Sequence, residues 1–138
     1  MDDYSEYCQQ GVSCSERYIK VNESVSLRVL GFIPADHEKV PIFIIGGLAT
    51  IVESFGQIIR ELSRDFPVWF IETRDRKTSR ITGGVSYSIE TMGIDVSTVI
   101  RSVIKGEKGF VMMGYSFGSS IMVESYHLLD DKPRCLIF

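Results

Sequence analysis

Hydrophobic and polar positions divide the chain into a series of strands and helices. Apolar and polar residues alternate over residues 18–21 and 25–30, on either side of the polar residues 22–24, which predicts an antiparallel hairpin at a sheet edge. Continuous apolar runs at residues 42–45, 68–71 and 110–113 are typical of strands buried on both faces of a sheet. Residues 135–138 form a fourth such run. Residues 1–16 show neither pattern and are expected to form a loose polar tail or a cap that orders late in folding.

Apolar residues recur at helical spacing between these runs. A helix near residues 54–63 would place Phe55, Ile58, Ile59 and Leu62 on one stripe. A second helix begins near Ser88, whose side chain can cap it, and a third covers residues 116–129. The apolar face of the second helix comprises Ile89, Met92, Val96, Val99, Ile100, Val103 and Ile104, and Gly106 suits its C′ position. Strands alternating with helices predict an α/β fold with right-handed crossovers and a mostly parallel sheet.

Composition restricts the class of protein. At 138 residues, with 44% apolar and 24% charged residues, the chain suits one domain, over residues 17–138, with a sizeable core. A net charge of −3 argues against nucleic acid as a partner. The longest nearly apolar stretch, residues 40–52, is too short to cross a bilayer, and the acidic start is no signal peptide. We therefore expect no membrane association.

The three cysteines, Cys8, Cys14 and Cys135, are odd in number and lack a C-x-x-C spacing. This pattern indicates neither a disulfide framework nor a zinc site. We expect reduced thiols in a cytoplasmic protein, no bound metal, and a Cys135 side chain packed within its strand.

The segment Gly114-Tyr115-Ser116-Phe117-Gly118 lies between the apolar run 110–113 and a helix. In a strand–turn–helix context, G-x-S-x-G is a nucleophile elbow, which exposes a serine hydroxyl beside backbone N–H donors. Gly114 and Gly118 would let strand and helix approach where a Cβ would clash. The bare pattern also arises as a chance Gly/Ser turn, but the flanking segments favour the elbow. Ser116 is therefore the candidate nucleophile.

Two backbone donors are candidates for an oxyanion hole. One is Phe117 N–H, and the other is Leu48 N–H in the loop after strand 42–45. Gly46 and Gly47 precede Leu48, and the alternative is that they form a simple tight turn. Ligands of such sheets lie at the carboxyl ends of the strands, so loops 46–50 and 72–82 should share one rim with the elbow.

A general base for Ser116 is not evident. His127 lies eleven residues along the same predicted helix, roughly 16 Å away at 1.5 Å per residue. His37 precedes strand 42–45 and should lie at the opposite end of the sheet. The carboxylates offer no orienting group either, because they lie in helices or on the wrong rim, or have no histidine to orient. These residues are Glu72, Asp75, Asp95, Glu124, Asp130 and Asp131.

The loop at 72–82 is rich in cations. Arg74, Arg76, Lys77 and Arg80 could attract an anionic substrate group, such as the phosphate of a pantetheine carrier or of coenzyme A. The alternative is a solvated loop in which Glu72 and Asp75 offset part of the charge. Arg74, Arg76 and Tyr115 are the candidate substrate contacts.

Taken together, residues 41–138 resemble the N-terminal half of an α/β-hydrolase, and are most similar to thioesterase domains that release acyl chains from carrier proteins. The resemblance lies in residues 41–47, 55–62, 66–69, 88–92 with Ile100, and the elbow with Glu124. The sequence departs from the family by having Gly46-Gly47 where many members have His-Gly, and Asp75 and Lys77 where many have glycines. It also ends at the strand after which the triad acid often follows.

The resemblance implies a serine hydrolase that cleaves acyl thioesters or esters through a Ser116 acyl-enzyme, without a cofactor. The base and acid would come from outside these residues, either from a complementing C-terminal half or from another chain. The last strand would be an unpaired edge, which predicts homo-oligomerisation through that edge or the bare face beside it. The alternatives are a non-catalytic binding module that retains the rim of the pocket and, less favoured because no G-x-G-x-x-G is present, a nucleotide-binding domain.

Overall fold

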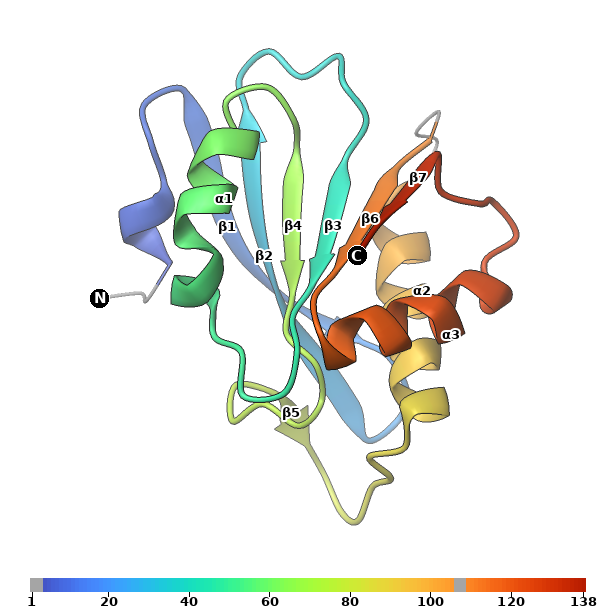
Figure 1. The fold of residues 1–138 in the computed structure, drawn as a ribbon. Coiled ribbons are helices and arrows are strands. Elements are labelled where there is room, and N and C mark those ends of the chain that lie inside the picture. Colours follow the sequence, from blue (N-terminus) through green and yellow to red (C-terminus); the bar gives the residue numbers. More distant parts are fainter. Residues whose placement is uncertain (1–3, 106–108) are drawn as a thin grey trace.

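The computed structural model describes residues 4–105 and 109–138. It contains a mixed seven-stranded sheet with the strand order β1-β2-β4-β3-β6-β7, in which the short β5 pairs with β2 (Figure 1). The strands are β1 (Val12–Lys20), β2 (Val25–Pro34), β3 (Ile42–Ile45), β4 (Val68–Ile71), β5 (Arg80–Ile81), β6 (Val111–Gly114) and β7 (Cys135–Ile137). The helices are η1 (Ser5–Tyr7), η2 (Val52–Phe55), α1 (Gly56–Leu62), α2 (Ile89–Val103) and α3 (Phe117–Leu128).

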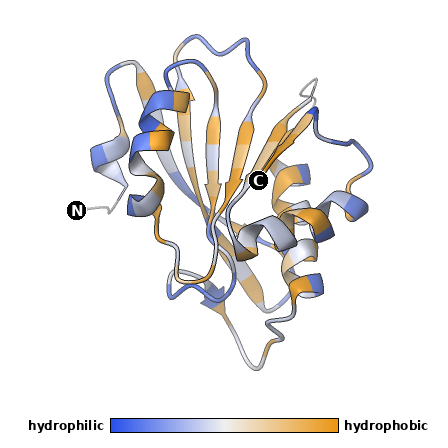
Figure 2. Cartoon of the chain, viewed as in Figure 1, coloured by the Kyte–Doolittle hydropathy of each residue, from blue (hydrophilic) through white to orange (hydrophobic). Residues whose placement is uncertain are grey.

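The centre of the sheet is parallel, as expected. β3 pairs in parallel with β4 on one side and with β6 on the other, and β6 pairs in parallel with β7. Side chains alternate between two buried clusters on opposite faces of the sheet. Phe43, Ile45 and Trp69 face the cluster that includes α2 and α3, whereas Ile44 and Phe70 face the cluster that includes η2 and α1. Figure 2 shows the apolar strands between more hydrophilic loops.

The N-terminal region is more ordered than the pattern predicted. The hairpin is confirmed, but β1 begins at Val12 and pairs along its whole length with β2. Residues 5–7 form a 3-10 turn, and Tyr4 is buried against Phe32. Of the two alternatives for residues 1–16, the loose tail is therefore wrong from Tyr4 onward, because Tyr4, Val12 and Cys14 pack on the α1 side of the sheet. Whether this segment orders late in folding stays a prediction.

The cysteine prediction also requires correction. Cys8 and Cys14 form a disulfide with their Cα atoms 5.9 Å apart, a separation within the ordinary range for disulfides. The chain reversal between η1 and β1 brings the two cysteines together, which an odd cysteine count could not reveal. Cys135 lies in β7 but is exposed rather than packed. The cytoplasmic location rested on three reduced thiols and stays an untested prediction.

The predicted helices are present, with one difference in the first of them. Ser88 caps α2, and its side chain accepts a hydrogen bond from Thr91 N–H. Phe55, at the end of η2, and Ile59, in α1, are buried, but Ile58 is 43% exposed. The segment starts as a 3-10 turn, and the buried stripe continues through Ser63 instead. Gly106, the expected C′ residue of α2, lies outside the described residues. Within residues 4–105 and 109–138, no helix is long and apolar enough to span a bilayer.

Candidate active site

Ser116 occupies a sharp turn between β6 and α3. Its backbone angles are φ 54° and ψ −123°, a left-handed conformation that non-glycine residues adopt only when the surrounding structure enforces it, at a cost of about 1–3 kcal/mol. Ser116 is exposed, and its carbonyl accepts a hydrogen bond from Ser119 N–H at 2.9 Å. The hydroxyl is thus presented at the start of α3, as a nucleophile elbow requires.

The glycines of the motif permit this turn. A Cβ on Gly118 would lie 2.3 Å from the Ile45 carbonyl oxygen and 2.5 Å from that of Gly46. The end of β3 therefore passes directly against the first turn of α3. Tyr115 N–H donates to the Ile45 carbonyl at 3.1 Å, and Gly118 N–H donates to the Tyr115 carbonyl at 2.9 Å. These hydrogen bonds fix the elbow to the end of β3.

The loop after β3 lies beside the nucleophile. A Cβ placed on Gly47 would be 3.1 Å from Ser116 Cβ and 3.0 Å from the Tyr115 carbonyl oxygen. Gly47 opens a turn that Thr50 N–H closes by donating to its carbonyl at 3.1 Å, with Ala49 at a positive φ of 56°. A tight turn that places Gly47 against Ser116 is compatible with both interpretations of Gly46-Gly47.

Within the described part of the chain, both candidate oxyanion donors lack a protein acceptor. Among the hydrogen bonds of residues 4–105 and 109–138, neither Leu48 N–H nor Phe117 N–H donates to the protein. Phe117 is the first residue of α3, where backbone N–H groups have no partner within the helix. Backbone N–H groups without an acceptor are the kind of donor that an oxyanion hole uses.

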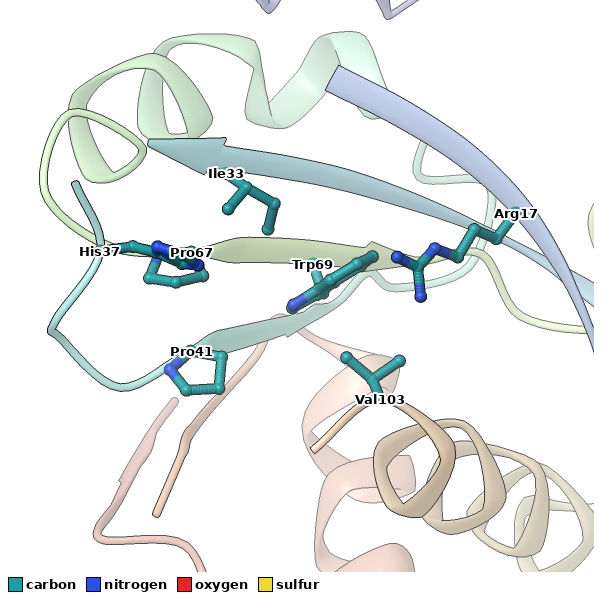
Figure 3. A pocket seen from close by; sticks show the side chains of 7 residues that line it. All are labelled: Arg17, Ile33, His37, Pro41, Pro67, Trp69 and Val103. Atoms are coloured by element: carbon teal, nitrogen blue, oxygen red, sulfur yellow. The ribbon is translucent and has the colours of Figure 1, made fainter. Parts of the chain in front are cut away.

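Neither histidine lies near Ser116. His37 lines a cavity of about 200 Å³ with Pro41 and Pro67, which precede β3 and β4 (Figure 3). Ser116 follows β6, which runs parallel to β3 and β4, so His37 lies at the opposite end of the sheet. His127 is in the last turn of α3, with its ring against Tyr126. The part of the chain that the structure describes thus supplies no imidazole to the nucleophile.

The carboxylates near the rim have partners of their own. Glu72 is buried, accepts a hydrogen bond from Arg28 at 3.2 Å, and accepts another from the Thr78 hydroxyl. Asp75 accepts a hydrogen bond from the Thr73 hydroxyl. Asp95, within α2, is also buried, and it pairs with Arg74 of the predicted basic cluster.

Arg74 forms a buried ion pair with Asp95. The Arg74 side chain is only 2% exposed. Its guanidinium donates to both carboxylate oxygens of Asp95 at 2.7 Å, and Nη1 donates to the Ser86 carbonyl at 2.9 Å. Arg74 is therefore not available to a substrate, and its expected role as an anion contact is wrong. Sequence reasoning missed the pair because its members are 21 positions apart and lie in different elements.

The other three cations of the loop do not form a single cluster either. Arg80 lies in β5 and stacks over the Tyr18 ring at 3.5 Å. Arg76 and Lys77 line a cavity of about 390 Å³, together with Ile51, Glu53, Glu72, Asp75 and Thr78. Only these two members of the predicted basic cluster stay together on the rim.

Apolar side chains surround the elbow on the side of η2. Tyr115 is 60% exposed and packs edge-on against Phe55, with ring centroids 5.9 Å apart. Leu48 and Ile51, in the loop after β3, are 64% and 44% exposed. An apolar rim next to a serine hydroxyl suits a hydrophobic substrate group.

Comparisons with known proteins identify the fold. No protein-family model matches the chain, and no curated protein matches it in sequence. An α/β-hydrolase from Novosphingobium aromaticivorans matches 89% of the chain with a TM-score of 0.76 and 18% identity. An epoxide hydrolase from Solanum tuberosum matches 90% with a TM-score of 0.74 and 17% identity. An N-formylmaleamic acid deformylase from Pseudomonas putida matches 84% with a TM-score of 0.66 and 19% identity.

The chain spans about two fifths of the length of these structures: 42%, 39% and 42% of them, respectively. At such low identities the likeness concerns the arrangement of strands and helices alone. The mixed sheet with its parallel centre, the helices on both faces and the order of the elements agree with it. The chain therefore has an α/β-hydrolase fold.

Proposed function

We propose that this chain carries the nucleophile and oxyanion hole of a serine hydrolase that cleaves acyl thioesters or esters. The observation that supports this most directly is the left-handed backbone of Ser116, at a strand–helix turn against which Gly47 packs. A strained, exposed serine is costly to maintain and is typical of functional sites. The resemblance to thioesterase domains supports acyl thioesters as the substrate class, and no cofactor is needed for this chemistry.

In the proposed reaction, Ser116 Oγ attacks the acyl carbon and its proton passes to a general base. Leu48 N–H and Phe117 N–H donate to the oxyanion, a contribution of roughly 2.7–4 kcal/mol for each donor in comparable sites. The thiol or alcohol leaves with a proton, and water then hydrolyses the acyl-enzyme. We propose that the base and acid belong to residues outside this sequence, which spans only about two fifths of the solved hydrolases that it matches.

A fluorophosphonate probe tests the nucleophile, because it bonds covalently to an activated serine. We expect labelling of the 138-residue chain at Ser116, detected as an increase in intact mass and lost in Ser116→Ala. Labelling should be slow without a base, since binding and an oxyanion hole alone retain about 10³–10⁴-fold of catalysis in serine proteases. Ser120→Ala is the matched control, because it removes an exposed serine from α3, the helix that follows Ser116. It should be labelled like the original chain.

The alternative is a binding module without chemistry. It is favoured by the positions of His37 and His127, neither of which lies near Ser116. Labelling of a longer chain but not of this one would show that the base lies in the additional residues. If neither chain were labelled, the binding module would be the better account.

A further inference from the structure

We infer that the cavity beside Trp69, on the side of the sheet that packs against α2, binds a small organic carboxylate with an apolar body. The cavity has a volume of about 200 Å³, and Figure 3 shows the side chains that line it. Pro41 and Pro67 of this lining precede β3 and β4, whereas Ser116 follows the parallel strand β6 at the opposite end of the sheet. The inference therefore goes beyond the proposed hydrolase function and does not depend on it.

The walls of the cavity are mostly apolar. Trp69 pairs with Gly31 of β2, and a Cβ on Gly31 would lie 2.6 Å from a ring carbon of the indole, so the ring lies against the backbone of β2. The other apolar residues in the lining are Ile33, Pro41, Pro67 and Val103. Since an engineered apolar cavity of about 150 Å³ binds benzene, the volume here suits a ring-sized body that carries a carboxylate.

The indole N–H of Trp69 is a donor without a protein acceptor. Trp69 is only 6% exposed, and its Nε1 forms no hydrogen bond within residues 4–105 and 109–138. Every fully buried side-chain nitrogen or oxygen in that part of the chain does have a partner, so Nε1 must reach open space. Figure 3 shows the nitrogen end of the ring on the side of Pro41 and His37, which also line the cavity. A ligand acceptor would supply the partner that a buried indole N–H ordinarily has.

Arg17 brings a positive charge to the same cavity. Its guanidinium carbon lies over the Trp69 ring, 4.8 Å from the centroid, and Figure 3 shows it on the side of the ring away from His37. A stacked guanidinium keeps its N–H donors in the plane of its fork, where they can bind both oxygens of a carboxylate. Arg17 forms no ion pair within the described residues, so its charge is available to a ligand.

The lining favours an anion over a cation. Among residues 4–105 and 109–138, no aspartate or glutamate lines the cavity, whereas Arg17 and His37 do. The acidic residues next to them in the chain are placed elsewhere: Glu16 pairs with a buried arginine of β2, Asp36 lines a different cavity, and Glu38 is exposed. The apolar walls in turn favour a carboxylate with a hydrocarbon body over an inorganic anion.

A titration of the 138-residue chain with sodium benzoate at constant ionic strength, followed by two-dimensional proton–nitrogen NMR, tests the inference. The chain has one tryptophan, so its single indole N–H signal reports on the cavity. We expect this signal and the backbone amides of Ile33 and Val103 to shift along one saturable curve. Benzamide has the same shape without the charge, and should bind about tenfold or more weakly because charge-assisted hydrogen bonds are lost. Acetate, which lacks the apolar ring, should bind more weakly by a similar factor.

Arg17→Gln should weaken benzoate binding about tenfold or more, for the same electrostatic reason. Arg60→Gln is the matched control, because it removes an exposed arginine that lies outside this cavity, and it should leave the affinity unchanged. Both variants should give the far-ultraviolet circular dichroism of the original chain, since both side chains are exposed. Ser116→Ala should bind benzoate like the original chain while losing fluorophosphonate labelling, which separates this site from the proposed hydrolase.

Several outcomes would overturn the carboxylate site. They are an unchanged indole signal, shifts without saturation, benzamide or acetate bound as tightly as benzoate, and equal affinities of Arg17→Gln and Arg60→Gln. Shifts centred on Leu48 and Phe117 would place benzoate at the candidate active site instead, and would also overturn the inference. Saturable binding at Trp69 without labelling of Ser116 would support the carboxylate site and count against the hydrolase alone.

Discussion

Gly118 is the single residue on which the geometry of the elbow depends most. Its missing side chain leaves room for the backbone carbonyls of Ile45 and Gly46, which would lie 2.3 and 2.5 Å from a Cβ. Backbone atoms at a strand end cannot rotate away as a flexible side chain can. A methyl group here must displace α3 from the sheet or unwind its first turn.

We therefore predict that Gly118→Ala destabilises the chain by about 3 kcal/mol, at the upper end of the cost of overpacking a core, and abolishes labelling of Ser116. Urea unfolding monitored by circular dichroism measures the first effect. Gly84→Ala is the control, because no atom lies within 4 Å of a Cβ at that position. It should leave stability unchanged or raise it by a few tenths of a kcal/mol, through the less flexible unfolded chain. Equal stabilities of the two variants would contradict the packing of β3 against α3.

Sequence reasoning located the serine and the glycines beside it because each acts through a local backbone requirement. G-x-S-x-G after an apolar run specifies a turn within five residues, and Gly46-Gly47 does the same after β3. The partners of Arg74 and Cys8 could not be found in this way. Arg74 pairs with a residue of another element, and the disulfide of Cys8 depends on a chain reversal. Both are set by three-dimensional placement rather than by spacing.

Among the elements, the segment between β4 and α2 depends on the buried pair Arg74–Asp95. Residues 72–88 hold only the two-residue strand β5, so few backbone hydrogen bonds fix them to the sheet. The pair joins the start of this segment to the middle of α2, and Arg74 Nη1 also holds the Ser86 carbonyl near its end. The rim that carries Arg76 and Lys77 is positioned by this link.

We predict that Arg74→Gln lowers the free energy of unfolding by about 3–5 kcal/mol, because it leaves the Asp95 carboxylate buried without a counter-charge. Arg74→Met/Asp95→Leu should recover most of the loss, since replacing both members of a buried pair by apolar residues is often neutral. Lys20→Gln is the control. It breaks the exposed pair with Glu23, whose side chain is 97% exposed, and should have little effect. Urea unfolding measures the free energy of unfolding of the three variants. An Arg74→Gln variant as stable as the original chain would argue against the buried pair.

At the level of elements, prediction succeeded where burial is continuous. β3 and β4 have the predicted bounds because a strand between two others is apolar at every position. The first half of β1 was missed, since its outward positions are polar and its inward positions include Cys14, which hydrophobic alternation does not single out. The two-residue β5 is too short to have a period at all. Edge strands of this kind gain their structure from the partner β2 rather than from their own sequence.

The whole molecule has an unequal distribution of apolar surface. Among the described residues, β7 pairs only with β6 and lies at one edge of the sheet. Ile137 and Phe138 are 39% and 74% exposed, and Val111 and Met113 on the neighbouring strand are only partly buried. An apolar edge with unpaired backbone groups can add a strand from another chain.

We therefore predict that the chain associates through β7, and that size-exclusion chromatography with light scattering at micromolar concentration gives a mass above that of the monomer. Ile137→Lys should shift the protein towards monomer, because a charge on an edge strand opposes strand addition. Ile94→Lys makes the same chemical change on an exposed position of α2, away from the edge, and should leave the mass unaltered. A compact monomer before any substitution would contradict the prediction, as would equal dissociation in both variants. Association through β7 would cover the apolar edge while leaving Ser116, which follows the carboxyl end of β6, open to substrate.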